Sequence, residues 1–206
     1  RDWYYDAAAF VTENKLVAGE EAYQFGGNEI ITRAEAAQAL YNLAGRPDCQ
    51  LTTAFTDVTV RSQQRDAISW VYQQGIMLGT SDGVFSPDQP LTRGMFATIL
   101  ARLAGVDTEN GATWYEKGMA WAVEQNISDG TAPEGGITRE QAVTMLYRYA
   151  GSPAVSGDHL ADFADAGAVS DWALAAMNWA VSVGLIEGGD AGLAPQNGAT
   201  RVELAA

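Results

Sequence analysis

The 206-residue chain has few of the side chains that disulfides, metal sites and catalytic triads require. It contains one cysteine, Cys49, and one histidine, His159. A single cysteine excludes an intrachain disulfide, and with it a small disulfide-stabilised scaffold. Both residues lie in predicted linkers, so they indicate neither a zinc site nor a nucleophilic triad. The G-x-S-x-G, H-E-x-x-H and P-loop motifs are also missing. We therefore predict a chain that is not an enzyme and that uses no metal and no cofactor.

Positive charge and long apolar runs are scarce as well. The chain has 12 lysines and arginines against 26 aspartates and glutamates, for a net charge of −14. Phosphate backbones would repel such a protein, so we expect no nucleic-acid partner. No apolar run approaches the roughly 20 residues of a membrane span, so we expect no membrane insertion. The 47% of apolar residues is typical of a folded protein with a core. Because the chain begins at Arg1 rather than Met, we interpret it as a mature or excised fragment.

Acidic residues in the loops raise two further possibilities. Asp82, Asp88 and Asp129 suggest calcium, but the D-x-[DN]-x-[DN]-G ladder with its distal glutamate is absent. We interpret these aspartates as turn formers and keep a dockerin-like calcium module as a distant alternative. Paired carboxylates could also hydrolyse glycosides. With 26 acidic residues such pairs arise by chance, and a hydrolase is disfavoured.

The chain does contain an internal repeat, marked by four Thr-Arg pairs. After each of the first three arginines comes a helix-like stretch that closes on a glycine, at Gly45, Gly105 and Gly151. We name these stretches the motif helices and expect the glycines to end them in a left-handed conformation. The pairs are Thr32-Arg33, Thr92-Arg93, Thr138-Arg139 and Thr200-Arg201.

Upstream of each motif helix lies a second helical pattern, which we name the leading helix. The leading helices cover residues 4–19, 64–79, 115–130 and 173–188. An aromatic residue recurs in the middle of each and is predicted to be core: Phe10, Trp70, Trp121 and Trp179. Seven residues earlier, two helical turns away, three copies have another tryptophan: Trp3, Trp114 and Trp172. These three could stack on a sugar ring or pack between repeats.

Glycine-rich loops join the leading helices to the motif helices. The segments "FTDV" (residues 55–58) and "FADA" (163–166) are predicted to be short extended anchors before two of the leading helices. The chain thus divides into helix–loop–helix units whose apolar faces are covered by stacking. The expected units are 1–47, 53–106, 112–152 and an incomplete 161–206.

The Thr-Arg pairs combine two roles. The threonines form predicted capping boxes with the residue three positions on, except that Met95 follows Thr92. The arginines are electrostatically misplaced, because a helix start favours anions. Either an anionic ligand is held by guanidinium and helix N–H groups, or a carboxylate of the adjacent repeat braces the interface. Both roles can coexist. The predicted boxes are Thr32–Glu35, Thr138–Gln141 and Thr200–Glu203.

The pattern "FTDV…DAISWVYQQGIMLGTSDGVFSPDQPLTRGMFATILARLAG", together with "ITRAE" in the first unit, resembles the S-layer homology (SLH) repeat of bacterial cell-surface proteins. The resemblance implies an all-α, pseudo-symmetric bundle of tandem repeats with glycine-rich loops, secreted to the cell surface. It also implies that grooves between repeats bind an anionic, often pyruvylated, secondary cell-wall polysaccharide. The implied ligand contacts are the motif arginines and loop residues, here Arg33, Arg93, Arg139, Arg201, Gly19, Gly79 and Gly130.

The departures from the family pattern support an alternative. The second unit lacks the acidic residue of its motif, the third loop is short, and the fourth unit stops early. A degenerate module of this kind could serve protein–protein assembly with neighbouring surface-layer subunits and not bind glycan.

Overall fold

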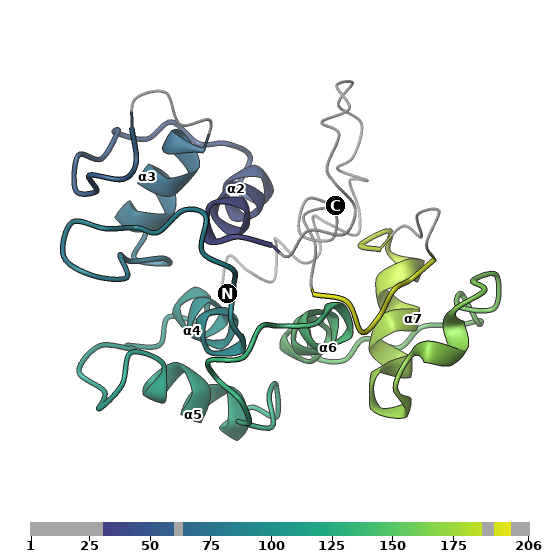
Figure 1. The fold of residues 1–206 in the computed structure, drawn as a ribbon. Helices are drawn as coiled ribbons and strands as arrows, with labels where there is room; N and C mark the ends of the chain where they lie inside the picture. The colour runs from purple at the N-terminus through teal and green to yellow at the C-terminus, as the bar shows by residue number, and fades with distance from the viewer. Residues whose placement is uncertain (1–30, 60–63, 187–191, 199–206) are drawn as a thin grey trace.

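The computed structural model describes residues 31–59, 64–186 and 192–198, and these residues form an all-α protein (Figure 1). Two short 3-10 helices, η1 (Ala166–Ala168) and η2 (Asp171–Ala173), precede the last helix, and the described residues form isolated β-bridges but no strand. The all-α expectation is confirmed. The predictions on Phe10 and on the first leading and fourth motif helices lie outside the described residues. The α-helices are α2 (Arg33–Leu43), α3 (Arg65–Gln73), α4 (Arg93–Leu103), α5 (Glu116–Glu124), α6 (Arg139–Tyr149) and α7 (Leu174–Ser182).

The helices pack across the boundaries of the sequence repeats. Each motif helix packs against the leading helix of the following unit, so the pairs are α2 with α3, α4 with α5, and α6 with α7. The motif helices α2, α4 and α6 lie toward the middle of the molecule, and the leading helices lie outside them (Figure 1). A linker therefore joins two helices that pack together, whereas a glycine-rich loop joins helices of different pairs.

The first N–H groups of each motif helix are satisfied by the loop of the next unit. The two N–H groups that open α2, α4 and α6 donate to backbone carbonyls of that loop. Because unpaired N–H groups at a helix start are costly when buried, each motif helix depends on the following loop. The pairs are Arg33–Gln89, Ala34–Pro87, Arg93–Gly135, Gly94–Pro133, Arg139–Asn197 and Glu140–Pro195, at 2.7–3.1 Å.

The loops are held in turn by the anchor segments 55–58 and 163–166. The Asp57 carboxylate accepts from the N–H groups of Phe85 and the following residue, at 2.9 and 2.7 Å. Asp165 accepts an equivalent pair of bonds from the last loop. Both segments are turns, so the prediction of extended anchors is wrong. In each turn the aspartate carboxylate lies next to the loop and accepts from two of its N–H groups.

Local signals set the ends of the motif helices as predicted. Gly45, Gly105 and Gly151 follow α2, α4 and α6 with φ of +79°, +77° and +82°. This left-handed conformation suits glycine because a side chain would be strained there.

The apolar side chains form two clusters that share α6. One cluster spans α2 to α6, and the other joins Val143 of α6 to Leu160, Met177 and their neighbours around α7. The predicted core tryptophans Trp70, Trp121 and Trp179 pack against these clusters but remain half-buried. Each of them contacts a tyrosine of a motif helix. In order, the tyrosines are Tyr41, Tyr149 and Tyr147.

Gly118 on α5 lies directly against Thr98 of α4. A Cβ at this position would lie 2.7 Å from both Cα and Oγ1 of Thr98. Alanine for glycine inside a helix ordinarily adds up to about 1 kcal/mol of stability. Here we expect Gly118→Ala to lower the free energy of unfolding by about 1–3 kcal/mol, because two helices must separate.

Urea denaturation followed by circular dichroism measures the effect. Gly136→Ala is the matched control, since a Cβ there meets nothing within 4 Å. A Gly118→Ala variant as stable as the wild type would contradict the close packing of α4 on α5.

Candidate functional site

All three described motif arginines are buried, and each reaches into the next unit. Arg33, Arg93 and Arg139 are only 6%, 8% and 6% exposed. The Arg33 guanidinium donates from Nε to the Phe85 carbonyl at 2.9 Å and from Nη2 to the Leu78 carbonyl at 2.6 Å. It also lies 4.7 Å from the centre of the Phe85 ring. Arg33 therefore holds the following loop by its backbone, without an ion pair within the described residues.

Arg93 braces the same kind of interface through a carboxylate. Its Nη2 lies 2.6 Å from Oδ1 of Asp129, and its Nη1 donates to the Thr131 hydroxyl at 2.8 Å. Asp129 stands eight residues after its core tryptophan, the place that Leu78 holds in the preceding unit. The third loop is shorter, and no described residue accepts from Arg93 Nε. Here the predicted carboxylate of the adjacent repeat is present.

Arg139 repeats the arrangement of Arg33. Its Nη1 donates to the Leu193 carbonyl at 2.9 Å. Leu193 corresponds to Phe85, because the N–H group of each is held by the aspartate of an anchor segment. Arg201 lies outside the described residues, as do Trp3, Gly19, Thr200 and Glu203.

These contacts explain why an arginine occurs at the helix start. Each guanidinium extends away from its own helix and donates to carbonyl or carboxylate oxygens of the next unit. The helix-start N–H groups that we expected to help bind a ligand are already bonded to loop carbonyls. The interface role of the arginines is thus present in every described copy, and a ligand would have to use their remaining donors.

The threonines cap the helices as predicted. Thr32 and Thr138 form complete capping boxes with Glu35 and Gln141. Thr92 accepts from the Met95 N–H at 3.2 Å but has no reciprocal side chain.

A groove of about 740 Å³, which we name the Arg33 groove, lies beside the first of these arginines. Its walls come from three units. They include Arg33, Thr98, Arg102, residues 76–80 after α3, and residues 108–114 before α5. The groove brings together Arg33, Gly79 and Trp114 from the predicted set of ligand contacts.

Two cations without an ion pair in the described residues share this groove. Arg102, in the last turn of α4, donates from Nε to the Thr108 hydroxyl at 2.7 Å and from Nη1 to the Ile76 carbonyl at 3.3 Å. Burial, and then repulsion by Arg102, lowers the pKa of Arg33 to about 10, although Asp57 opposes the shift. Burial also lowers the pKa of Arg102, against the attraction of Glu109. Both arginines remain charged at neutral pH.

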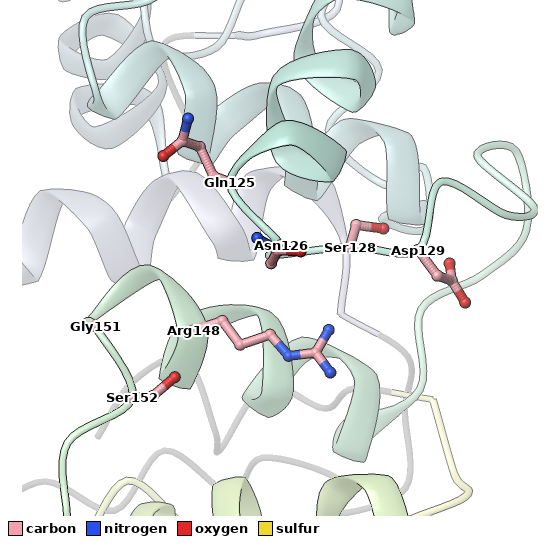
Figure 2. Close-up of a pocket in the computed structure, with 7 residues that line it drawn as sticks. All are labelled: Gln125, Asn126, Ser128, Asp129, Arg148, Gly151 and Ser152. Atoms are coloured by element: carbon pink, nitrogen blue, oxygen red, sulfur yellow. The ribbon is translucent and has the colours of Figure 1, made fainter.

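A second hollow of about 570 Å³, the Arg148 groove, lies between the ends of α5 and α6. Figure 2 shows the Arg148 side chain extending from α6 beneath the segment that carries Asn126, Ser128 and Asp129. Arg148 Nη1 lies 3.5 Å from the Ile127 carbonyl, the equivalent of the Arg102 contact with Ile76. The motif arginine that corresponds to Arg33 here is Arg93 of the preceding unit, which pairs with Asp129 and does not line the hollow.

The tryptophans predicted near the helix starts are exposed. Trp114 and Trp172 are 48% and 51% exposed. Trp114 lies in the turn before α5, and Trp172 lies in η2. The seven-residue spacing would put each on the same helix face as its core tryptophan only if the helix extended that far. Both α-helices begin after the tryptophan, with Tyr115 and Ala173 at their N-cap positions. Trp114 lines the Arg33 groove, whereas Trp172 lines neither described groove.

The loop glycines have steric reasons to be glycine. A Cβ on Gly79 would lie 2.7 Å from the Val84 carbonyl oxygen and 2.9 Å from the Phe55 ring. Gly130 has a φ of +78°. Their backbone freedom shapes the loops, and Gly79 alone of the two lines a described groove.

Sequence reasoning missed Arg102, Thr98 and Thr108 as groove residues. One signal could have found Arg102. An arginine recurs nine residues after the motif arginine in two units, at Arg102 and Arg148, where Asn42 stands in the first. Thr98 and Thr108 have no comparable repeat.

The described residues also lack two features that would change the interpretation of the site. No three His, Cys, Asp or Glu side chains gather there in a cluster that could hold a metal ion. No helix in the same residues has the length and apolar character needed to cross a membrane.

The Arg93–Asp129 pair should make the free energy of unfolding decrease at low pH. The N–H group of Thr131, followed by the Arg93 and Thr131 side chains, lowers the pKa of Asp129 to about 2, against desolvation. Folding therefore favours the charged form of Asp129. Its contribution to the free energy of unfolding is complete above the usual pKa of 3.8. It is lost as the pH falls from there through about 2. Because the Asp129 side chain is 62% exposed, we expect at most about 1 kcal/mol.

Asp129→Asn should lose this contribution at pH 6 and match the wild type near pH 2. Guanidinium denaturation at both pH values measures the difference, with Asp82→Asn, in an exposed turn, as the matched control. An Asn variant whose deficit persists unchanged at pH 2 would contradict the electrostatic origin.

Comparison with known proteins agrees with this architecture. The S-layer homology domain family matches residues 1–37, 54–97 and 162–205. The third Thr-Arg pair, with the short loop before it, lies outside these matches.

Relatives include surface proteins and an enzyme. The "Surface-layer 125 kDa protein" of Lysinibacillus sphaericus is 31% identical over 149 residues, covering 68% of this chain and 12% of the relative. The "Endoglucanase" of Bacillus sp. (strain KSM-635) is 29% identical over 73% of this chain and 18% of the relative. "Cell surface glycoprotein 1" of Acetivibrio thermocellus is 29% identical over 57% of this chain and 6% of the relative.

The chain thus spans less than a fifth of each of these relatives. More than half of it matches the family, and it folds into the all-α repeats that the resemblance implies. The chain belongs to the S-layer homology domain family and is a module of the bacterial cell surface.

Proposed function

We propose that this anchoring module binds an anionic cell-wall polysaccharide, carrying pyruvate ketals, in the Arg33 groove. One observation carries the proposal: Arg33, Gly79 and Trp114 come from three different sequence units, yet they line the same groove. A cation, an open loop backbone and an exposed aromatic ring are the groups that an acidic sugar requires. The relatives support a cell-surface role, since two of them are named as surface proteins.

The charge of the protein restricts where such a ligand could bind. With a net charge of −14 the molecule repels polyanions at long range. Attraction must therefore be local, and Arg33 and Arg102 supply it without an ion-paired carboxylate in the described residues. Salt should weaken the binding, because the groove is open to solvent and its charges are screened.

Trp114 allows a direct test with a matched control. Calorimetry with purified pyruvylated wall polysaccharide should show binding that Trp114→Ala weakens by about two- to tenfold. This corresponds to an aromatic contact of about 0.5–1.5 kcal/mol. Trp172→Ala should bind like the wild type, because Trp172 is equally exposed but lies outside the groove.

Equal weakening by both variants would contradict a site in the Arg33 groove. A wild-type protein that shows no binding, but forms concentration-dependent oligomers in light scattering, would favour the assembly role.

A further inference from the structure

We propose that one carboxylate of the polysaccharide sits between Arg33 and Arg102, which makes Arg102 a second ligand-binding arginine of the groove. The inference rests on the proposed function and specifies its chemistry. The motif arginine alone is the expected contact, and nothing in the Thr-Arg pattern points to Arg102. The placement of the two guanidinium groups is what points to Arg102.

Both arginines keep N–H donors that no described residue uses. Arg33 uses Nε and Nη2 on the carbonyls of Phe85 and Leu78, and no described residue accepts from its Nη1. Arg102 uses Nε and Nη1 on Thr108 and Ile76, and no described residue accepts from its Nη2. Each guanidinium is thus fixed by two bonds and retains donors at one end. Both residues line the same groove.

The two arginines are close enough for repulsion by Arg102 to depress the pKa of Arg33. Asp57 faces Arg33, Glu109 faces Arg102, and Glu134 lines the groove. None of these carboxylates lies within ion-pair distance of either arginine in the described residues. A bound carboxylate between the two would replace repulsion by attraction and satisfy donors on both.

The Arg148 groove supplies an internal comparison. It has the arginine that corresponds to Arg102, but the counterpart of Arg33, which is Arg93 of the preceding unit, is paired with Asp129 2.6 Å away. A protein carboxylate thus already holds the cation that would complete the pair. The two-arginine site is therefore specific to the Arg33 groove among the grooves of the described residues.

Arg102→Gln is the decisive variant, because Arg102 is half-buried at the end of α4 and its side chain is not part of the core. We expect it to weaken binding of pyruvylated wall polysaccharide at least tenfold in calorimetry, the loss typical of a hydrogen bond to a charged group. Arg148→Gln removes the corresponding charge from the other groove and should leave the affinity unchanged. Circular dichroism melting verifies that each variant is folded.

Two further measurements test the shared carboxylate. Polysaccharide stripped of its pyruvate ketals by mild acid should bind wild type and Arg102→Gln equally weakly. In a double-mutant cycle with Arg33→Lys, the two losses should combine to less than their product, because both arginines hold one group.

The outcomes separate this inference from the proposed function. A wild-type protein that binds no polysaccharide refutes the proposed function. Wild-type binding that Arg102→Gln leaves intact refutes the role of Arg102 alone. Two results would refute a carboxylate shared by both arginines. One is that the affinity losses of Arg33→Lys and Arg102→Gln multiply fully in the double variant, and the other is that polysaccharide without pyruvate ketals binds the wild type with full affinity.

Discussion

The fold depends on one recurring contact, in which the start of each motif helix is completed by the loop of the next unit. Two backbone N–H groups and one arginine cross the boundary each time, and carbonyl oxygens of the following loop receive most of their bonds. Left alone, a unit would expose an apolar helix face and would lose the loop carbonyls that accept from the N–H groups of its helix start. Helix pairing follows the same logic, since each motif helix packs on the leading helix of the following unit. The stability of each unit therefore depends on its contacts with the following unit.

That dependence also limits where a ligand could bind. An anion at the helix N-terminus would compete with carbonyls that are already bonded at 2.7–3.1 Å. Positive charge without an ion-paired carboxylate in the described residues lies instead on Arg33 and Arg102, which line the Arg33 groove. The anchor aspartates strengthen this separation, because Asp57 fixes the loop whose carbonyls hold Arg33. Structure and proposed binding thus use different atoms of the same residue.

The sequence predicts those features of the fold that are determined by residues close together in the chain. The ends of the motif helices followed from Thr32, Thr92 and Thr138 at one side and from glycines at the other, because caps act within one turn. The family and the all-α class followed from the repeat. The pairing of motif helix with the next leading helix did not, because it is set by contacts between units and not by a signal within one turn. The start of α5 at Glu116, just after the turn that contains Trp114, lies within one residue of the start predicted from the repeat.

The site was harder to predict because it is assembled from parts far apart in the chain. Arg33 and Gly79 belonged to a repeated pattern and could be proposed from it. Arg102 recurs as well, yet its relevance appears only when α4 is placed against the linker that carries Thr108. The role of Asp129 likewise depends on a partner 36 residues away.

The difference between Leu78 and Asp129 shows how repeats of one fold can diverge in chemistry. At this place the first interface offers a backbone carbonyl to its arginine, and the second offers a carboxylate. A carbonyl fixes the guanidinium but leaves its charge uncompensated, whereas a carboxylate fixes and neutralises it together. The fold tolerates both, because either oxygen satisfies the buried donor. For an external anion the two interfaces differ, because only the carbonyl partner leaves the positive charge of the arginine uncompensated and able to attract the anion. One side chain at a repeat boundary can therefore decide whether a groove is available to a ligand without changing how the units stack.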